Sequence, residues 1–295
     1  MSLDQDEADI EASRAPLLEH LVELRSRLII CVGALAIGFA ICFAFATQIY
    51  EILLHPFKVA AEIMAAQKIS GGHGNPFDLL FALIGLKEVP PATQDLKLIF
   101  TAPLEFFFTK LKLAGFGAVV LTFPVLASQI YGFVAPGLYK RERHAFLPFL
   151  LASPALFILG AALVYYMILP FVLWFSLSQQ IVGTGVSVEL LPKVSDYLTL
   201  VTTLLMAFGL CFQLPVVLTL LGMAGMVSSK MLAEGRRYAI VAVFVVAAVV
   251  TPPDPISQTM LAIPIILLYE ISIWCVRLIE RARHREDEGR DIVPV

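Results

Sequence analysis

The sequence predicts an all-α membrane protein, a kinked bundle of six transmembrane helices with both termini on the cytoplasmic side. Three observations support this fold class. The chain has 295 residues, of which 59% are hydrophobic and only 15% are charged, a balance outside the range of soluble domains. Several stretches of about 20 residues without charge are long enough to cross a bilayer. The basic residues are divided unequally between the two sets of loops, which indicates the orientation.

The uncharged stretches define the expected spans within one membrane domain that covers residues 1–295. An acidic tail and an amphipathic surface helix occupy residues 1–27, and a second cytoplasmic tail occupies 277–295. The expected spans are residues 28–47, 113–135, 146–177, 197–222, 238–250 and 256–276. The fifth is short, because a helix of 13 residues reaches only about 20 Å against a hydrocarbon core of about 30 Å. We expect the bilayer to be thinner there, or longer neighbours to support this helix.

The orientation follows from lysine and arginine. With six spans, 14 of the 21 basic residues fall on the side of the termini, including all twelve arginines. Cytoplasmic loops carry an excess of such residues. The charge pattern therefore agrees with the six spans and predicts cytoplasmic termini.

Prolines recur inside the expected spans, and each removes a backbone hydrogen bond and tends to kink its helix. They are Pro124, Pro154, Pro170, Pro215 and Pro264. These kinks fit either ordinary irregularity of membrane helices or a bundle that is curved into a shaped scaffold. Polar residues deep in the spans are few, which argues against a pump or ion channel.

Three polar residues lie in or near the last three expected spans, and Gln213 has two interpretations. Gln213 either bonds a neighbouring helix of the same chain or docks a polar residue of another protein in the membrane. Glu270 lies about two turns before Arg277, and we expect it to reach the cytoplasmic interface and form a salt bridge. Asp254 ends the TPPD turn, where it is expected to cap the sixth helix.

No enzyme motif is present. HLVEL is not a metalloprotease motif, and GGHGNP (residues 71–76) lacks the strand and helix that a phosphate-binding loop requires. The four cysteines lie in apolar stretches without metal-ligand spacing. We expect no catalytic residue, no cofactor, no bound metal and no nucleic-acid partner.

Two acids lie among cations at the predicted cytoplasmic face. Glu23 is in HLVELRSRL (residues 20–28), and Glu142 is in PGLYKRER (residues 136–143). A carboxylate binds an arginine guanidinium through paired, charge-assisted hydrogen bonds, so such acids suit a cationic peptide. The alternative is a local ion pair, Glu23 with Arg27 at i,i+4 and Glu142 with a loop neighbour.

Four segments together resemble the C subunit of the twin-arginine protein translocase, the TatC family. They are HLVELRSRL, the run from FP to PGLYKRER (residues 123–143), AFGLCFQLP (residues 207–215) and VTPPDPISQTMLAIPIILLYE (residues 250–270). The resemblance extends over about residues 17–280, with the motifs in the expected order.

The resemblance implies a receptor and core subunit that binds twin-arginine signal peptides and exports folded proteins across the bacterial cytoplasmic membrane, driven by the proton-motive force. It implies single-span TatA- and TatB-type partners and a homo-oligomer within a receptor complex. The residues implied in signal-peptide binding are Glu23, Glu142, Arg25, Phe133 and Lys140, and the matched structural positions include Pro56 and Asp254.

The sequence departs from the family pattern in two places. Many members have glutamate where this chain has Gln213, which cannot titrate. The first external loop, residues 58–105, is long and contains the apolar stretch 76–86, expected to be an interfacial helix, a partner surface or a segment buried on the bundle. A secondary transporter or channel for a small solute is the competing function, but it would need a polar midplane site. A structural scaffold without transport is the third possibility.

Overall fold

The computed structural model describes the backbone of residues 3–70, 81–86, 99, 101–134, 146–178, 193–251 and 255–290. Side chains are described for residues 21–63, 81–86, 99, 101–133, 151–176, 193–251, 255 and 257–282. In these ranges the chain is helical, apart from turns and one isolated bridge between Ile99 and Lys193. The all-α prediction is therefore confirmed.

The helices follow one another along the chain in this order: α1 Leu3–Ala44, α2 Ala46–Ser70, α4 Glu105–Val134, α5 Phe146–Leu163, the π-helix η3 Val164–Ile168, α6 Leu169–Ser178, α7 Val194–Cys211, α8 Leu214–Met223, α9 Ser229–Glu234, α10 Arg236–Val250 and α11 Pro255–Arg290.

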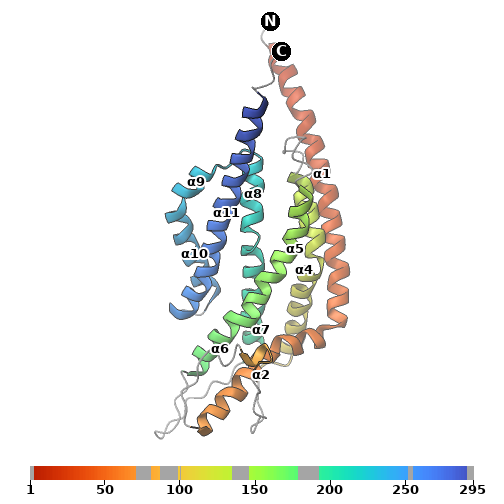
Figure 1. Cartoon of the computed structure of the whole chain (residues 1–295). Helices are drawn as coiled ribbons and strands as arrows, with labels where there is room; N and C mark the ends of the chain where they lie inside the picture. Colours follow the sequence, from red (N-terminus) through yellow and green to blue (C-terminus); the bar gives the residue numbers. More distant parts are fainter. Residues whose placement is uncertain are drawn as a thin grey trace.

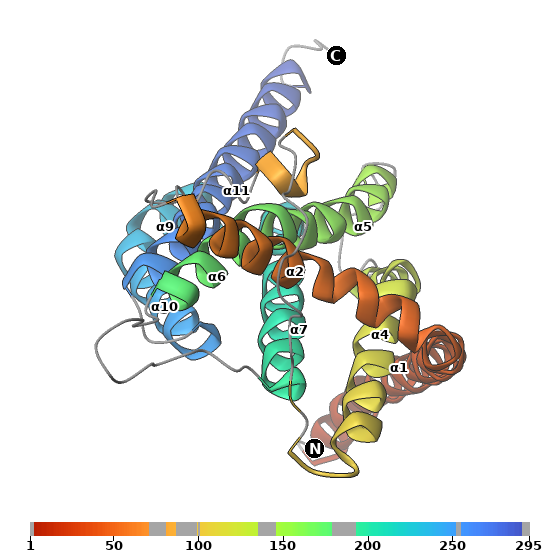
Figure 2. The same ribbon diagram turned by 90° about the horizontal axis from the view of Figure 1, so that it is seen from below.

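The long helices run roughly along one axis and form an open bundle (Figure 1). Helices α1 and α4 lie together at one edge, α7 and α8 lie near the centre, and α10 and α11 form the other edge. The start of α1 and the end of α11 lie at the same end of the bundle, while α2 crosses the opposite end. Viewed along the axis, α2 passes over the base of the bundle from α1 towards α6 (Figure 2).

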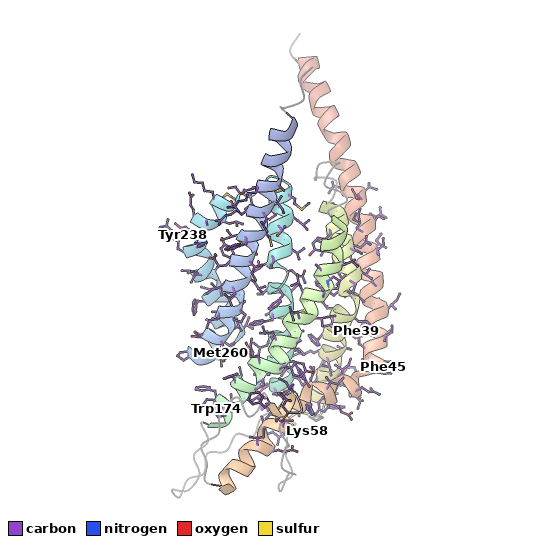
Figure 3. All side chains as sticks on the ribbon, viewed as in Figure 1. Phe39, Phe45, Lys58, Trp174, Tyr238 and Met260 are labelled. Carbon is purple, nitrogen blue, oxygen red and sulfur yellow. The ribbon has the colours of Figure 1, made fainter. Side chains whose placement is uncertain are left out.

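Within the described residues, five segments are long and apolar enough to cross a membrane. They are Leu21–Ala44, Glu105–Phe133, Leu151–Ser176, Val194–Met223 and Ser257–Ala282. The remaining expected span, residues 238–250, lies within α10, a helix of 15 residues that begins at Arg236. In Figure 3, Met260, near the start of α11, lies higher in the view than Trp174 and Lys58 and at about the level of Phe45, just after α1. The sixth span and the cytoplasmic side of the termini stay predictions.

The surface helix and the first span, which the sequence suggested as separate segments, form one continuous helix of 42 residues, α1. No glycine or proline signal between residues 21 and 28 ends the helix, so the amphipathic part continues directly into the apolar part.

The proline positions coincide with irregular backbone in two of the helices. Before Pro170 the chain makes the π-helix η3, in which the Leu169 N–H donates to the Val164 carbonyl. Before Pro215 the α-helix stops at Cys211 and resumes as α8 at Leu214. Irregular turns such as these are a known cause of bends in helices. They accommodate proline, which cannot donate a backbone hydrogen bond.

Small residues allow α1 and α4 to approach closely along their antiparallel contact. A Cβ atom on Gly38 would lie 2.6 Å from the Cγ2 of Thr122, and one on Gly117 would lie 2.9 Å from the Sγ of Cys42. Close approach over small residues is a common way for membrane helices to associate, because lipid provides no hydrophobic force between them.

The core joins α2, the α5–α7 region and α11. Between α5 and α7, an aromatic ring on each side packs against a glycine on the other. A Cβ on Gly209 would lie 2.5 Å from the Phe157 ring, and one on Gly160 would lie 2.8 Å from the Phe212 ring. Part of the apolar loop stretch joins this core, since Ala82 is buried there and Leu83 packs against it. Phe81, Ile84 and Leu86 of the same stretch are exposed.

Candidate functional site

Glu23 and Arg27 face each other one turn apart on α1. The Arg27 Nη2 and Nε both donate to the Oε1 of Glu23, at 2.7 and 3.0 Å. Both side chains are partly accessible, 26% for Arg27 and 34% for Glu23. The i,i+4 ion pair considered from the sequence is therefore present. It also shows that this carboxylate accepts a guanidinium in two-point contact at the surface.

Arg27 connects this acid to the end of α4. Its guanidinium lies so close to Gly132 that a Cβ at that position would overlap it. Phe133 follows directly and is half-buried, and α4 ends one residue later at Val134. A side chain at Gly132 would have to displace the Arg27 guanidinium, so this glycine leaves room for the Glu23–Arg27 pair beside α4.

The structure brings some of the predicted binding residues together. Arg27 pairs with Glu23 and lies against Gly132, the residue before Phe133, at the end of the bundle that also holds the start of α1 and the end of α11 (Figure 1). Arg25 is on the same part of α1 and is exposed. Lys140 and Glu142 lie outside the described residues, six and eight positions after the end of α4. Asp254 lies outside them as well.

Gln213 is buried at the break between α7 and α8, with 7% of its surface exposed. Its Oε1 accepts from the Ser153 hydroxyl at 2.7 Å and from the Tyr131 hydroxyl at 3.3 Å. Its Nε2 donates to the Ser153 carbonyl at 2.9 Å. The amide thus joins α4, α5 and the α7–α8 junction within the chain, as the first of the two interpretations stated, and docking of a partner at this position stays a prediction.

Pro56 is buried inside α2, and two tyrosines distant in sequence donate hydrogen bonds to backbone carbonyls of this helix. Pro56 has no N–H to donate to the carbonyl of Ile52 four residues earlier. The Tyr165 hydroxyl takes this place at 2.8 Å, and the Tyr197 hydroxyl donates to the neighbouring Leu53 carbonyl at 2.9 Å. The proline is therefore a point where α2 is fastened to the π-helix and to α7.

Glu270 forms the expected salt bridge, and its partner is Arg236 rather than the nearer-in-sequence Arg277. The Arg236 Nε and Nη2 lie 2.8 Å from the two carboxylate oxygens of Glu270. This pair holds the start of α10 against α11. In the same region the Tyr269 hydroxyl donates to the Leu232 carbonyl at 2.8 Å.

Several residues that position these groups were not identified from the sequence. Tyr131, Ser153, Tyr165 and Tyr197 read there as ordinary span residues, because their partners lie between 22 and 144 positions away. A proline inside a helix does signal a carbonyl that needs a donor, but the sequence does not say which tyrosine supplies it.

The family model for the Sec-independent protein translocase protein TatC matches residues 19–264. The chain belongs to the TatC family. It is 43% identical over 283 residues to the TatC protein of Magnetococcus marinus, covering 96% of this chain and 91% of that protein. It is 34% identical to TatC of Escherichia coli strain K12, covering 92% of each. A crystal structure of a twin-arginine translocase receptor TatC matches with a TM-score of 0.67 and 35% identity, covering 88% of this chain and 98% of that one.

Membership fixes the general role of this TatC chain. It is a membrane-embedded subunit of a Sec-independent protein translocase, in a family of translocase subunits rather than enzymes. Membership also implies a complex with other Tat components. Within this TatC fold, the Glu23–Arg27 ion pair lies at one end of the bundle, and the buried Gln213 amide joins α4, α5 and the α7–α8 junction.

Proposed function

We propose that the chain is the receptor for twin-arginine signal peptides and that Glu23 and Glu142 bind the arginine pair. The observation that carries this proposal is the geometry of Glu23, a surface carboxylate that accepts two hydrogen bonds from one guanidinium and lies beside the end of α4. Arg27 occupies the position that an arginine of the signal peptide would take. An arriving arginine would therefore exchange with Arg27 for the same carboxylate.

The second acid is within reach of the same place. Glu142 follows the end of α4 by eight residues, so the chain between them spans at most about 28 Å. Two consecutive arginines need two acids, or one acid and carbonyl groups, to satisfy their donors. The cations around the acids, among them Arg25 and Lys140, would repel basic peptides whose arginines are not correctly placed.

The rest of the proposal follows from membership of the translocase family. The chain would export folded proteins across the bacterial cytoplasmic membrane, driven by the proton-motive force, with TatA- and TatB-type single-span subunits and as a homo-oligomer within the receptor complex. Its termini, Glu23 and Glu142 would face the cytoplasm, where a signal peptide arrives. The arginine bias supports this orientation.

The proposal predicts that Glu23→Ala and Glu142→Ala each weaken binding of a twin-arginine signal peptide by about 1.5–3 kcal/mol, or about 10–150-fold, because each removes a charge-assisted acceptor. Binding of a fluorescent signal peptide to the purified chain in lipid nanodiscs measures the effect. Glu51→Ala is the matched control, since this exposed glutamate is on α2 at the opposite end of the bundle.

Two readings of that experiment bear on the proposal. We expect a peptide with two lysines in place of the arginines to bind weakly to the unchanged chain and to lose little on Glu23→Ala. Unchanged binding of the arginine peptide to the Glu23→Ala, Glu142→Ala double variant would refute the assignment of these acids.

A further inference from the structure

A groove runs along the outer side of the contact between α4 and α7. Its volume is about 490 Å³, and it is lined by Gly115, Phe116 and Val119 of α4 and by Thr203, Met206 and Leu210 of α7. Apolar side chains dominate this lining, and Leu210 is 53% exposed at its edge. Helices α4 and α7 contact each other and are neighbours in the axial view (Figure 2). The groove therefore faces the surroundings of the bundle, which are acyl chains if α4 and α7 span a membrane.

A polar cavity continues the groove towards the end of the bundle where α4 and α7 begin. This cavity is small, about 10 Å³, and shares Thr202 with the groove. Its other lining residues include Lys112, Thr109 and Thr199. The side chain of Lys112 is exposed and makes no ion pair with any residue that the structure describes. Lys112 thus lines the polar cavity that adjoins one end of the apolar groove.

Of the other charged groups near this end, Glu105 and Lys110 have partners, and neither Lys193 nor Asp196 lines the cavity. The Glu105 carboxylate accepts from the backbone N–H groups of Thr101 and Ala102 at 2.7 and 3.2 Å, and from the hydroxyls of Thr101 and Ser195 at 3.0 and 2.5 Å. Lys110 lies over the Phe106 ring at 4.9 Å. Asp196 is exposed and does not line either cavity. Lys112 is therefore the cation that lines the cavity.

We propose that this groove binds one phospholipid, with its phosphate at Lys112 and one acyl chain between α4 and α7. A lysine ammonium is a compact donor that binds phosphate as a point charge, and its long stem reaches from an apolar wall to a headgroup. The apolar lining ends at this charge, as the structure of a phospholipid requires. The lining combines the small residues Gly115, Thr202, Thr203 and Ala207 with larger apolar ones, so its size alone does not select the occupant. The cation of the adjoining cavity favours a lipid phosphate over an uncharged helix.

Two substitutions test the two parts of the site separately. Lys112→Gln removes the charge and keeps the length of the side chain. Gly115→Leu places a side chain in the groove, and its Cβ enters open space, because no atom lies within 4 Å of a Cβ at Gly115. The matched controls are Lys110→Gln, on the same helix but outside both cavities, and Gly33→Leu, a position on α1 that is equally open.

Native mass spectrometry of the intact chain in detergent, titrated with phosphatidylglycerol, measures the number and affinity of retained lipids. We expect one tightly held lipid on the unchanged chain and on both controls. We expect about tenfold weaker retention in Lys112→Gln, the size of a lost charge-assisted bond, and loss of that lipid in Gly115→Leu. Diacylglycerol with the same acyl chains should not be retained.

Other outcomes would overturn the proposal. Equal lipid retention in all four variants and the unchanged chain would show that no specific site exists. Loss in Lys110→Gln as large as in Lys112→Gln would show that general surface charge holds the lipid. Displacement of the lipid by an uncharged transmembrane peptide, together with retained phosphatidylglycerol binding in Gly115→Leu, would assign the groove to a helix. The proposal does not depend on signal-peptide binding, which is measured at the opposite end of α4.

Discussion

The amide of Gln213 shows why a single buried polar residue matters more in a membrane bundle than its size suggests. Its oxygen accepts two hydroxyls and its nitrogen donates to a carbonyl, so three helices share one side chain. A buried polar group without partners costs more than a satisfied one contributes. Gln213, Ser153 and Tyr131 therefore act as one unit, and replacement of Gln213 removes the acceptor that the two hydroxyls share.

Replacement of Gln213 by leucine should destabilise the chain by about 1–3 kcal/mol, because the buried Ser153 loses the acceptor of its hydroxyl and the side-chain donor to its carbonyl. Thermal unfolding in detergent measures this effect. We also expect signal-peptide binding to stay within about twofold, as the site at Glu23 is on another part of the bundle, and association with a single-span partner to fall.

The outcome distinguishes the two interpretations of Gln213. Addition of Ser153→Ala to Gln213→Leu should restore part of the lost stability, because it removes a hydroxyl that would otherwise be unsatisfied. A stability equal to that of the unchanged chain in Gln213→Leu would contradict the internal role. Lost signal-peptide binding with retained partner association would contradict the docking role.

Sequence reasoning reached some residues of the site and missed others for a physical reason. Glu23 and Arg27 were paired correctly because i,i+4 spacing on a helix is local information. The partner of Glu270 was not identified, since Arg236 lies 34 positions away and is brought near only by the turn between α10 and α11. Tyr131 and Ser153 were missed because nothing in an apolar run shows which hydroxyl faces a distant amide.

At the scale of helices, the kink in α2 is held by groups that belong to other elements. Pro56 leaves the Ile52 carbonyl without its usual donor, and Tyr165 of the π-helix supplies one. The Tyr197 hydroxyl of α7 donates a hydrogen bond to the neighbouring Leu53 carbonyl. The shape of α2 at the base of the bundle thus depends on α7 and on the widened turn before Pro170.

A double-mutant cycle tests this dependence. Tyr165→Phe should lower the stability of the bundle by about 1 kcal/mol, because it removes one hydrogen bond to a backbone carbonyl. In a Pro56→Ala background the same change should cost less, since alanine restores the N–H that Ile52 needs. Tyr166→Phe, at the next position, is the control. Costs that simply add in the two backgrounds would show that Tyr165 does not compensate for the proline.

The helices themselves were largely predictable from runs of uncharged residues. The runs located α1, α4, α5–α6, α7–α8, α10 and α11, and the prolines marked the break before α8. The sequence did not indicate that α2 continues for 25 residues beyond the first span. Its apolar and polar residues alternate without a long uncharged run, and its buried face becomes evident only when α6 and α7 pack on it.

At the scale of the whole molecule, the start of α1 and the end of α11 share one end of the bundle and α2 occupies the other. This agrees with an even number of crossings, which requires α10 to cross together with α11. Helix α10 has only 15 residues, so its crossing depends on a thinner bilayer or on its neighbours. The Arg236–Glu270 pair contributes by fixing α10 to the much longer α11.

Labelling of single cysteines tests this topology. In a variant without the four native cysteines, Lys58→Cys on α2 and Lys230→Cys on α9 place one exposed thiol at each end of the bundle. A membrane-impermeant maleimide added outside intact spheroplasts should label Lys58→Cys and leave Lys230→Cys unlabelled. After lysis both should react. Labelling of Lys230→Cys in intact cells would reverse the orientation, and labelling of both would refute the six-span arrangement.

The fastening of α2 by Tyr165 and Tyr197 also has a consequence for biosynthesis. These tyrosines leave the ribosome 109 and 141 residues after Pro56, a delay of roughly 5–30 s at ordinary rates of synthesis. During this interval the Ile52 carbonyl, to which Pro56 cannot donate, lacks the Tyr165 hydroxyl and is left to water. The segment around Pro56 must therefore wait in a hydrated place at the membrane surface, and it reaches its final position only after the second half of the chain has been inserted.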